Sequence, residues 1–422
     1  MKPQLNQSLI KKWGAVLESN IGKPIKSQSE AHVVASMLEN QYKLNKGYLG
    51  ESANLTSDMA TYQNYALPLV RRMFPELLAM NVTSVQPMTQ PYGLAFSLRF
   101  RYDDCGVNSF SDPEMGYNYV RPQFTGTGTS GNPSGWNTAD GELLSNYMEN
   151  CAGGLVTPAN QIARGKLTIE QASIQAKTRK IKTSYTLEMQ QDLASVHGQD
   201  VEQLMMEALQ YELQQELDRE LLGRMQIAAA NPALGGAPAY TIDVTPNLTP
   251  GVSGTTVTSD GRFSQEKFAT IANAIVAAAQ KIRITTRQGQ GNFVICSPGV
   301  VAALQSLNNG IFTRNDTSVN GSQMGVKVGT LLGSQIDVYV DTFATQEYAL
   351  VGFKGEKIGQ AGIMYMPYVP LVVQKTMGAE DASPRIILST RYAILDNLFG
   401  SGLFYRQLNF VGLNAYFPGL GF

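Results

Sequence analysis

The alternation of hydrophobic and polar positions in Tyr185–Leu222 predicts two consecutive helices. The first ends at His197-Gly198, where glycine can take the left-handed conformation that closes a helix. The second begins after Asp200, a good N-cap residue, with Gln203 at the spacing of a capping box. With no proline, and no glycine before Gly223, about 22 residues form a rod of about 33 Å. Such a rod is typical of a structural spine rather than of an active-site loop.

The second of these helices carries two stripes. Apolar residues recur at helical spacing and are predicted to form the buried stripe, at Leu204, Met205, Ala208, Leu209, Leu213, Leu217 and Leu221. The polar stripe is predicted to face the other way, at Gln203, Glu207, Gln210, Gln214 and Asp218.

Leu94–Tyr102 alternates strictly between large apolar and smaller or charged residues, which predicts a strand. A matching return with period two occurs in Leu167–Tyr185, after a polar, Gly-rich stretch. A long two-stranded hairpin is marginal in water, so we expect it to pack on a neighbouring subunit. The residues expected to make that intersubunit contact are Phe96, Leu98 and Phe100.

The second half of the chain predicts a mixed architecture. A linker over Asn231–Gly261 is followed by a helix from Ser264 to about Ile282. Gly291–Gly299 predicts a buried strand, then Ser297 as N-cap and Pro298 at the first helical position. Further strands are predicted at Gln335–Val340, Tyr348–Phe353, Gly362–Val373 and Arg385–Ile394. Helices and strands in this order indicate an α+β fold.

The first 51 residues differ from the rest, with more Lys than Glu and no Arg. Two short amphipathic helical patterns run through Ile10, Trp13, Val16 and Leu17, and through Val33, Val34, Met37 and Leu38. Such a segment is consistent with a mobile arm, a partner-binding helix or a removable propeptide.

Composition and charge narrow the function classes. The 422 residues are 43% hydrophobic, enough for sizeable cores. The 33 Lys+Arg and 34 Asp+Glu leave a net charge of -1, without the basic excess typical of free-standing DNA or anionic-membrane binders. Cys105, Cys151 and Cys296 form no CxxC pair, which favours a reduced compartment. With no signal-peptide or membrane-spanning pattern, we expect a soluble chain.

The sequence offers no convincing catalytic, cofactor or metal site. Histidine is the usual catalytic base, and the two histidines are His32, in the N-terminal segment, and His197, which favours a helix-ending role. Cys296 is expected to be a buried structural cysteine. The Gly289-Gln290-Gly291 run precedes its strand, whereas a dinucleotide fingerprint follows one. We therefore expect no enzyme, no cofactor and no metal.

A basic run occupies the return strand, at Lys177, Arg179, Lys180 and Lys182. It is expected to form a solvated or intersubunit charged face, matched by acids such as Glu207 and Asp218 of a neighbour.

Five blocks in one order resemble the major capsid protein family of T-even-type tailed phages. They are RRMFPELLA at Arg71–Ala79 with Val85–Met88, QDLASVHG at Gln191–Gly198, RQGQGNFVI at Arg287–Ile295, AGIMYMPYVPL at Ala361–Leu371, and Thr390–Tyr392. The resemblance implies an HK97-like capsid fold with an N-terminal arm, an extended loop, a peripheral domain with the spine helix, and an axial domain. The inserted region of the loop is shorter than the family's, and the tail from Leu395 is longer.

The resemblance also implies a domain order and partners. The expected segments are 1–51, a candidate propeptide; 52–93, the arm and start of the peripheral domain; 94–185, the extended loop; 186–261, the peripheral domain; 262–384, the axial domain; and 385–422, a C-terminal strand and tail. The implied function is self-assembly, in hexamers and pentamers, into the icosahedral virion head. Implied partners are a scaffold, a prohead protease, portal or vertex and decoration proteins, and packaged DNA without sequence specificity; no membrane is implied.

The family's protease cuts after Glu in a Leu/Ile-x-Glu context. Leu49-Gly50-Glu51 fits this context, so Ser52 is the expected new N-terminus, and Met37-Leu38-Glu39 is a weaker candidate. Two related alternatives stay open from the sequence: a vertex (pentamer) protein of the same fold and a phage-derived nanocompartment shell. Before assembly the chain is expected in the host cytoplasm.

Overall fold

A computed structural model of the chain describes residues 7–17, 28–49, 78–103, 114–115, 127–129, 132–135, 138, 164–197, 200–244, 264–307, 310, 312–314, 326–331, 335–357, 359–378 and 383–416. These residues fall into two compact units. The second unit comprises Leu94–Ser173 and Ile284–Arg287, and the rest of the chain belongs to the first.

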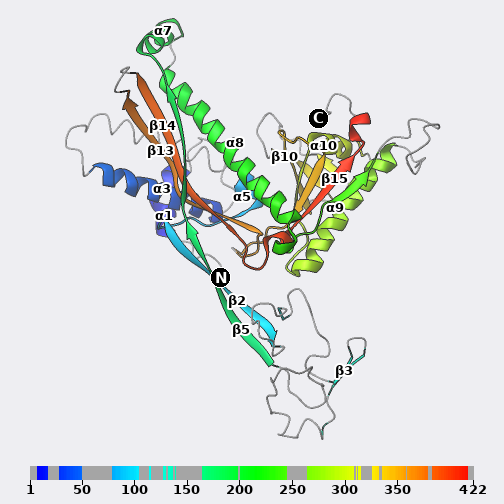
Figure 1. The fold of residues 1–422 in the computed structure, drawn as a ribbon. Coiled ribbons are helices and arrows are strands. Elements are labelled where there is room, and N and C mark those ends of the chain that lie inside the picture. The colour runs from blue at the N-terminus through cyan, green and yellow to red at the C-terminus, as the bar shows by residue number, and fades with distance from the viewer. Residues whose placement is uncertain are drawn as a thin grey trace. The chain divides into compact units, whose positions relative to one another are not determined.

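A seven-stranded sheet forms one core of the first unit (Figure 1). Its strands in order are β7 (Tyr240–Asp243), β15 (Tyr405–Val411), β12 (Tyr348–Gly352), β8 (Phe293–Cys296), β11 (Ile336–Val340), β10 (Val326–Leu331) and β9 (Phe312–Arg314). All four residues of the central strand β8 are buried, which confirms the prediction of a buried strand there. Helix α10 (Pro298–Gln305) follows with Ser297 at the N-cap position and Pro298 at its first position, as predicted, but the Ser297 hydroxyl donates to the Glu347 carboxylate instead of capping the helix.

A four-stranded sheet forms the other core of this unit. Its strands in order are β1 (Ser84–Val85), β13 (Ile363–Met377), β14 (Pro384–Asp396) and β6 (Lys177–Ser184). β13 and β14 form a long antiparallel hairpin, to which β6 adds as an edge strand. The strands of the expected 262–384 segment thus divide between two sheets.

Helix α8 (Val201–Ala230) packs on both sheets and is the predicted spine (Figure 1). Asp200 is its N-cap, and the Asp200 carboxylate accepts a hydrogen bond of 3.0 Å from the Glu202 N–H. Further helices of this unit are α5 (Leu78–Val82), α7 (Leu187–His197), α9 (Ser264–Thr286) and the 3-10 turns η3 (Pro232–Leu234), η4 (Ser401–Phe404) and η5 (Leu413–Ala415).

The predicted length of the spine was wrong. Helix α8 does not end at Gly223 but continues to Ala230, which gives it 30 residues in all. A helical glycine costs only about 1 kcal/mol relative to alanine, and packing offsets a cost of this size. The helix ends instead at Asn231, whose side chain accepts a hydrogen bond from the Ala233 N–H and so starts the next turn before Pro232.

The predicted polar stripe of the spine was also wrong. Gln210, Gln214 and Asp218 are buried, whereas Leu204 is 43% exposed. The buried face of α8 combines apolar and polar residues, namely Val201, Met206, Gln210, Leu213, Gln214, Gln215, Leu217, Asp218, Leu221, Leu222, Met225, Ala228 and Ala229. Asp218 is held inside because its carboxylate accepts from the backbone N–H of Leu78 at 3.3 Å.

Two segments beyond the predicted strands also belong to the core. Residues 231–244, predicted as a linker, contribute η3 and strand β7, which pairs in parallel with β15. The tail beyond Leu395 supplies η4 and β15, and Phe404 and Tyr405 are fully buried. The tail therefore completes the seven-stranded sheet rather than docking on its surface.

Three N-terminal helices, α1 (Gln7–Lys12), α2 (Gly14–Leu17) and α3 (Gln28–Leu49), belong to the first unit, and α3 packs on β13. The Asn40 amide donates to the backbone oxygens of Met88 and Tyr368 at 2.9 and 3.0 Å. Val34, Met37 and Leu38 are fully buried, as the amphipathic pattern predicted. In this structure α3 therefore lies packed against β13 through its apolar stripe.

Lys354, partly buried just after β12, is joined to α5, because its ammonium group donates to the backbone oxygen of Met80. Burial lowers the pKa of Lys354 to about 8, although the carboxylate of Glu30 acts to raise it. The ordinary pKa is 10.5, so between about pH 8 and 10.5 the unfolded chain binds more protons than the folded chain. The cost of burying the charge is therefore present at neutral pH and is relieved as pH rises.

We predict that the free energy of unfolding of the wild-type chain rises relative to that of Lys354→Met between pH 7.5 and pH 10, by on the order of 3 kcal/mol in the limit. Denaturant unfolding at several pH values measures this difference. Lys357→Met, at an exposed neighbouring position, is the control and is expected to track the wild-type curve. Parallel curves for wild type and Lys354→Met would show that Lys354 carries no such linkage.

Candidate assembly surfaces

The second unit contains a two-stranded sheet of β2 (Tyr92–Asp103) and β5 (Arg164–Gln175) and a short pair, β3 (Thr127–Thr129) with β4 (Asn132–Ser134). Strand β2 confirms the prediction from Leu94–Tyr102. The return strand was predicted as one run from Leu167 to Tyr185. The strand is interrupted at Ala176, and the residues after it form β6, which pairs in the four-stranded sheet. Period two continues through the break, so the sequence pattern does not reveal it.

The hairpin exposes its apolar face. The side chains of Phe96, Leu98 and Phe100 are 64%, 59% and 63% exposed. Other large apolar residues of the two strands are as open: Tyr92, Leu94, Leu167 and Ile169. Exposing so many apolar side chains is unfavourable, because burying one of them stabilises a protein by about 1.5–3 kcal/mol.

The opposite face of the hairpin is polar and covered. Arg101 is 4% exposed and its guanidinium lies 2.5 Å from the Glu170 carboxylate, which Arg99 also approaches at 3.3 Å. Cross-strand charge pairs of this kind fix which residues of β2 and β5 face each other. The hairpin thus has internal order and an apolar face that the described residues leave open; burial of that face by a second copy remains a prediction.

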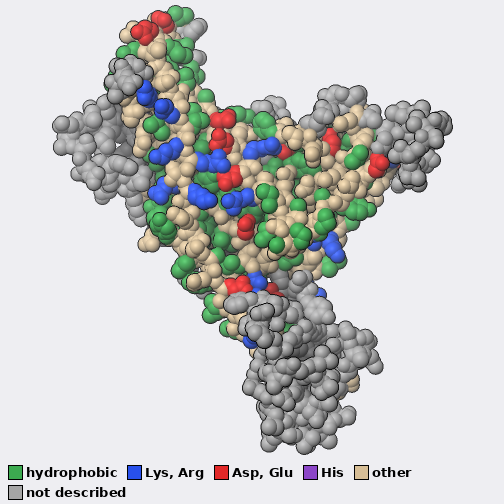
Figure 2. Space-filling view, in the orientation of Figure 1, with side chains coloured by type: hydrophobic (Ala, Val, Ile, Leu, Met, Phe, Trp, Pro, Cys, Tyr) green, Lys and Arg blue, Asp and Glu red, His purple; other side chains and the backbone are tan. Residues whose placement is uncertain are grey.

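Arg179, one of the four basic residues on β6, is paired within the chain, whereas Lys177, Lys180 and Lys182 are exposed. Arg179 binds Glu216 and Glu220 of α8, each at 2.7 Å, and its guanidinium also donates to the Tyr392 hydroxyl. Burial raises the pKa of Glu220, but hydrogen bonds from Tyr392 and Arg179 outweigh it and lower the pKa overall. Asp218, which was expected to pair with this run from a neighbouring copy, is only 1% exposed and binds the backbone of Leu78 inside the core. Figure 2 shows the Lys and Arg side chains gathered along β6 and α8 with acids between them.

A second ion pair fixes α8 to the seven-stranded sheet. Arg219 lies 3.2 Å from the buried carboxylate of Asp341, which also accepts from the Tyr348 hydroxyl and from the Phe343 N–H. The spine is therefore joined by charged hydrogen bonds to both sheets of its unit. Sequence reasoning missed these contacts because the partners lie 37 or more positions apart.

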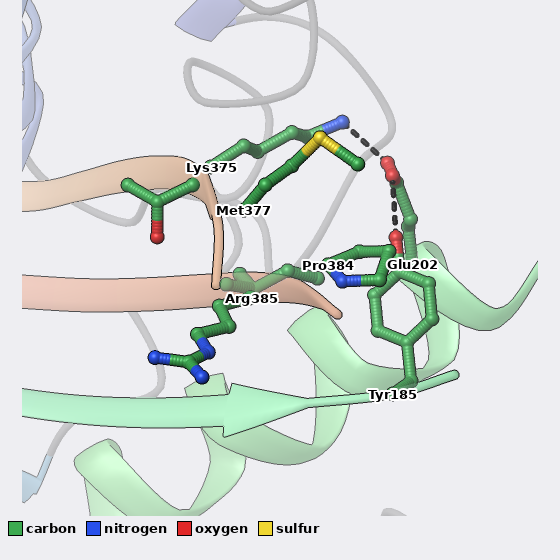
Figure 3. Close-up of a pocket in the computed structure, with 8 residues that line it drawn as sticks. Tyr185, Glu202, Lys375, Met377, Pro384 and Arg385 are labelled. Atoms are coloured by element: carbon green, nitrogen blue, oxygen red, sulfur yellow. Dashed lines mark hydrogen bonds and ion pairs between the residues drawn. The ribbon is translucent and has the colours of Figure 1, made fainter. Parts of the chain in front are cut away.

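A pocket of about 230 Å³ lies where β13 and β14 meet the start of α8 (Figure 3). It is lined by Tyr185, Glu202, Lys375, Thr376, Met377, Pro384, Arg385 and Ile386. Glu202 accepts from Lys375 and, at 2.8 Å, from the Tyr185 hydroxyl. Burial raises the pKa of Glu202, but these two donors lower it below the ordinary value. The pocket therefore combines apolar walls with ionised groups.

The residues considered for catalysis lie on three separate elements, β8, α3 and α7. Cys296 is fully buried, and burial together with the charge of Glu347 raises the pKa of its thiol. His32 lies on α3, and burial lowers its pKa. His197 ends α7, as predicted. Among the described residues, no group of three or more His, Cys, Asp or Glu side chains is placed to hold a metal ion.

Within the same ranges, no helix is long and apolar enough to cross a membrane. The candidate cleavage residues Glu51 and Ser52 lie outside the described residues, as does the Gly-rich stretch at Thr125–Gly131 apart from strand β3.

A long spine helix, two sheets and a hairpin with an exposed apolar face are the main features of the described residues, and none of them forms a recognisable catalytic or ligand site there. The family described as major capsid protein Gp23 matches residues 59–410. The major capsid protein of Salmonella phage ViI is 29% identical over 416 residues, covering 94% of this chain and 92% of that protein. The major capsid protein of Enterobacteria phage T4 is 26% identical, with 97% of each chain covered.

The chain belongs to the Gp23 family of major capsid proteins of tailed phages. The match supports a major capsid protein over the vertex protein and the nanocompartment shell that the sequence left open. Self-association and a place in the virion capsid come with this membership.

Solved chains from phages also align with this chain. A chain from Mycobacterium phage Bobi gives a TM-score of 0.41 at 11% identity, covering 80% of this chain and 91% of that one. The capsid of Myoviridae phage XM1 gives 0.38 at 12% identity, covering 78% and 90%. Similarity at this level carries no argument about function, and the family assignment rests on the sequence match.

Proposed function

We propose that the chain builds an icosahedral head shell around packaged DNA, as hexamers and pentamers with an HK97-like arrangement of spine, hairpin and two domains. The observation that carries the proposal is the exposed apolar face of the β2–β5 hairpin. A side chain such as Leu98 gains stability only when another surface covers it. In an assembly of this family, a second copy of the chain is always available to cover such a side chain.

The role is structural, and the assembled shell rather than a reaction is its product. The near-neutral balance of charge suits an inner surface that tolerates DNA of any sequence. A scaffold, a prohead protease, and portal or vertex and decoration proteins are the proposed partners, met in the host cytoplasm before the chain enters the virion. Electron microscopy of the purified chain tests the proposal, because shells support it and compact oligomers alone contradict it.

We also propose that maturation removes residues 1–51 by cleavage between Glu51 and Ser52. The alternative site after Glu39 is disfavoured, because Glu39 lies inside α3 and its carboxylate binds Lys12 at 2.6 Å and the Trp13 indole at 3.1 Å. A protease must bind its substrate extended, so cleavage there would require α3 to unfold.

Mass spectrometry of mature heads checks this prediction. The expected protein begins at Ser52, and Glu51→Gln is expected to retain the N-terminal segment. Glu39→Gln is the matched control and should still be cut after Glu51. A mature protein that begins at Met1 or Lys2 contradicts the cleavage but leaves the shell function standing.

A further inference from the structure

The four-stranded sheet is strongly basic, although the chain as a whole carries a net charge of -1. Strand β6 contains four Lys or Arg residues and no acid. Strands β13 and β14 add Lys375, Arg385 and Arg391, against the single acid Asp396. Positive charge is therefore concentrated in one sheet, and the net charge of the chain conceals it.

The face of this sheet that packs on α8 is neutralised by acids of that helix. Arg179 binds Glu216 and Glu220, each at 2.7 Å. Thr183, also at an odd-numbered position of β6, contacts α8 as well, because its hydroxyl donates to the Met205 sulfur at 3.8 Å. Successive side chains of a strand point to opposite faces, so the odd-numbered residues of β6 face α8 and the even-numbered residues face away from it.

The even-numbered residues of β6 form a polar row. Its members are Thr178, Lys180, Lys182 and Ser184, and all four are exposed. In the part of the chain that the structure describes, neither lysine has an ion-pair partner. Every second residue of a strand is about 6.6–6.8 Å further along, so the row is about 20 Å long. Because β6 is the edge strand of its sheet, a ligand can approach the row from the face and from the edge.

The chemistry of the row fits a phosphate polymer better than a protein segment. Lysine ammonium groups and Ser or Thr hydroxyls commonly bind the phosphate oxygens of DNA without reading its bases. The row contains no aromatic or aliphatic residue, whereas protein interfaces depend on such anchors. A lysine ammonium is a point charge on a flexible stem and does not require bidentate geometry, so it can bind phosphates in many positions.

We propose that Lys180 and Lys182, flanked by Thr178 and Ser184, form a sequence-independent contact surface for the phosphate backbone of packaged DNA. The inference rests on the proposed shell function and deepens it, because it identifies which face of the four-stranded sheet is turned toward the interior of the shell. Lysines on an edge strand also hinder unwanted strand pairing. That role alone predicts no salt-dependent binding of DNA, so the two roles give different results.

The salt dependence of DNA binding tests this surface on the full-length, unassembled chain. Fluorescence anisotropy of a labelled duplex measures the affinity at increasing salt concentrations. Each phosphate contact adds about 0.9 to the slope of log affinity against log salt, so Lys180→Gln and Lys182→Gln should each reduce the slope by about 1 and the double variant by about 2. Two duplexes of unrelated sequence should give the same result. Lys357→Gln, at an exposed position outside this sheet, is the control and should keep the wild-type slope.

Two outcomes of this titration contradict the proposal. A wild-type slope in the double variant, or no binding of DNA by the wild-type chain at low salt, would overturn it. Polyglutamate at an equal concentration of charges serves as the competing polyanion. Tighter binding of the wild-type chain to polyglutamate than to DNA would favour an acidic protein segment as the partner and would also overturn the proposal.

Lysine acetylation in assembled shells tests which way the face is turned. DNA-filled and empty shells are treated with acetic anhydride, and mass spectrometry measures the modification of each lysine. Lys180 and Lys182 should be acetylated several-fold less in filled than in empty shells, and Lys357 to the same extent in both. Equal acetylation of Lys180 and Lys182 in the two kinds of shell would overturn the proposal. If the chain forms no shells, the proposed function fails, whereas the titration of the unassembled chain still judges the DNA contact separately.

Discussion

Leu98→Asp is expected to leave a folded chain that no longer forms shells. Leu98 is 59% exposed at the middle of the apolar face of the hairpin, so the folded chain tolerates a carboxylate there. In an assembled shell the same carboxylate would be buried against apolar surface, and an unpaired buried charge costs several kcal/mol at every contact. Because the contact repeats in every copy, even a modest free-energy cost per contact is enough to prevent the shell from closing.

Circular dichroism, to establish that the variant is folded, and electron microscopy of the assembly reaction are the measurements. Leu98→Met keeps volume and polarity and is the control, expected to assemble normally. Phe96→Asp and Phe100→Asp, on the same face, should behave like Leu98→Asp. Normal shells from all three aspartate variants would contradict the view that this face is an intersubunit surface.

The hairpin shows what sequence alone predicts well. Strict alternation from Leu94 to Phe100 determines which side chains share a face, because successive residues of a strand point in opposite directions. The buried strand β8 and the cap at Asp200 are local in the same sense. Each depends on residues within a few positions of one another, so no tertiary information is needed.

The spine shows where sequence reasoning fails. Hydrophobic periodicity assumes one uniform core on one side of a helix, but α8 packs on two sheets and on α5. Asp218 is buried because a backbone N–H of α5 meets it, and Leu204 is exposed although it fits the apolar period. The pairing of Arg179 with Glu220 and of Arg219 with Asp341 joins elements distant in sequence, which no local pattern encodes. The pocket beside α7 was missed for the same reason.

The observed burial of α8 predicts different losses of stability for the same leucine-to-alanine substitution at two positions. Leu213 and Leu204 were assigned to one apolar stripe, but Leu213 is 2% exposed and Leu204 is 43% exposed. Leu213→Ala removes a buried side chain and is expected to lower the free energy of unfolding by about 2–5 kcal/mol. Leu204→Ala changes helix propensity equally and leaves no cavity, so its expected effect is at most about 1 kcal/mol.

Denaturant unfolding of the unassembled chain, followed by far-ultraviolet circular dichroism, measures both changes under one set of conditions. The buried glutamine at position 214 gives a further test of the corrected stripe. The original stripe predicts that Gln214→Ala is silent, whereas the 3% exposure of Gln214 predicts a loss of about 1–3 kcal/mol from the cavity left behind. Equal losses of unfolding free energy at Leu213 and Leu204, with no loss at Gln214, would support the apolar stripe predicted from the sequence. They would contradict the packing of α8 described above.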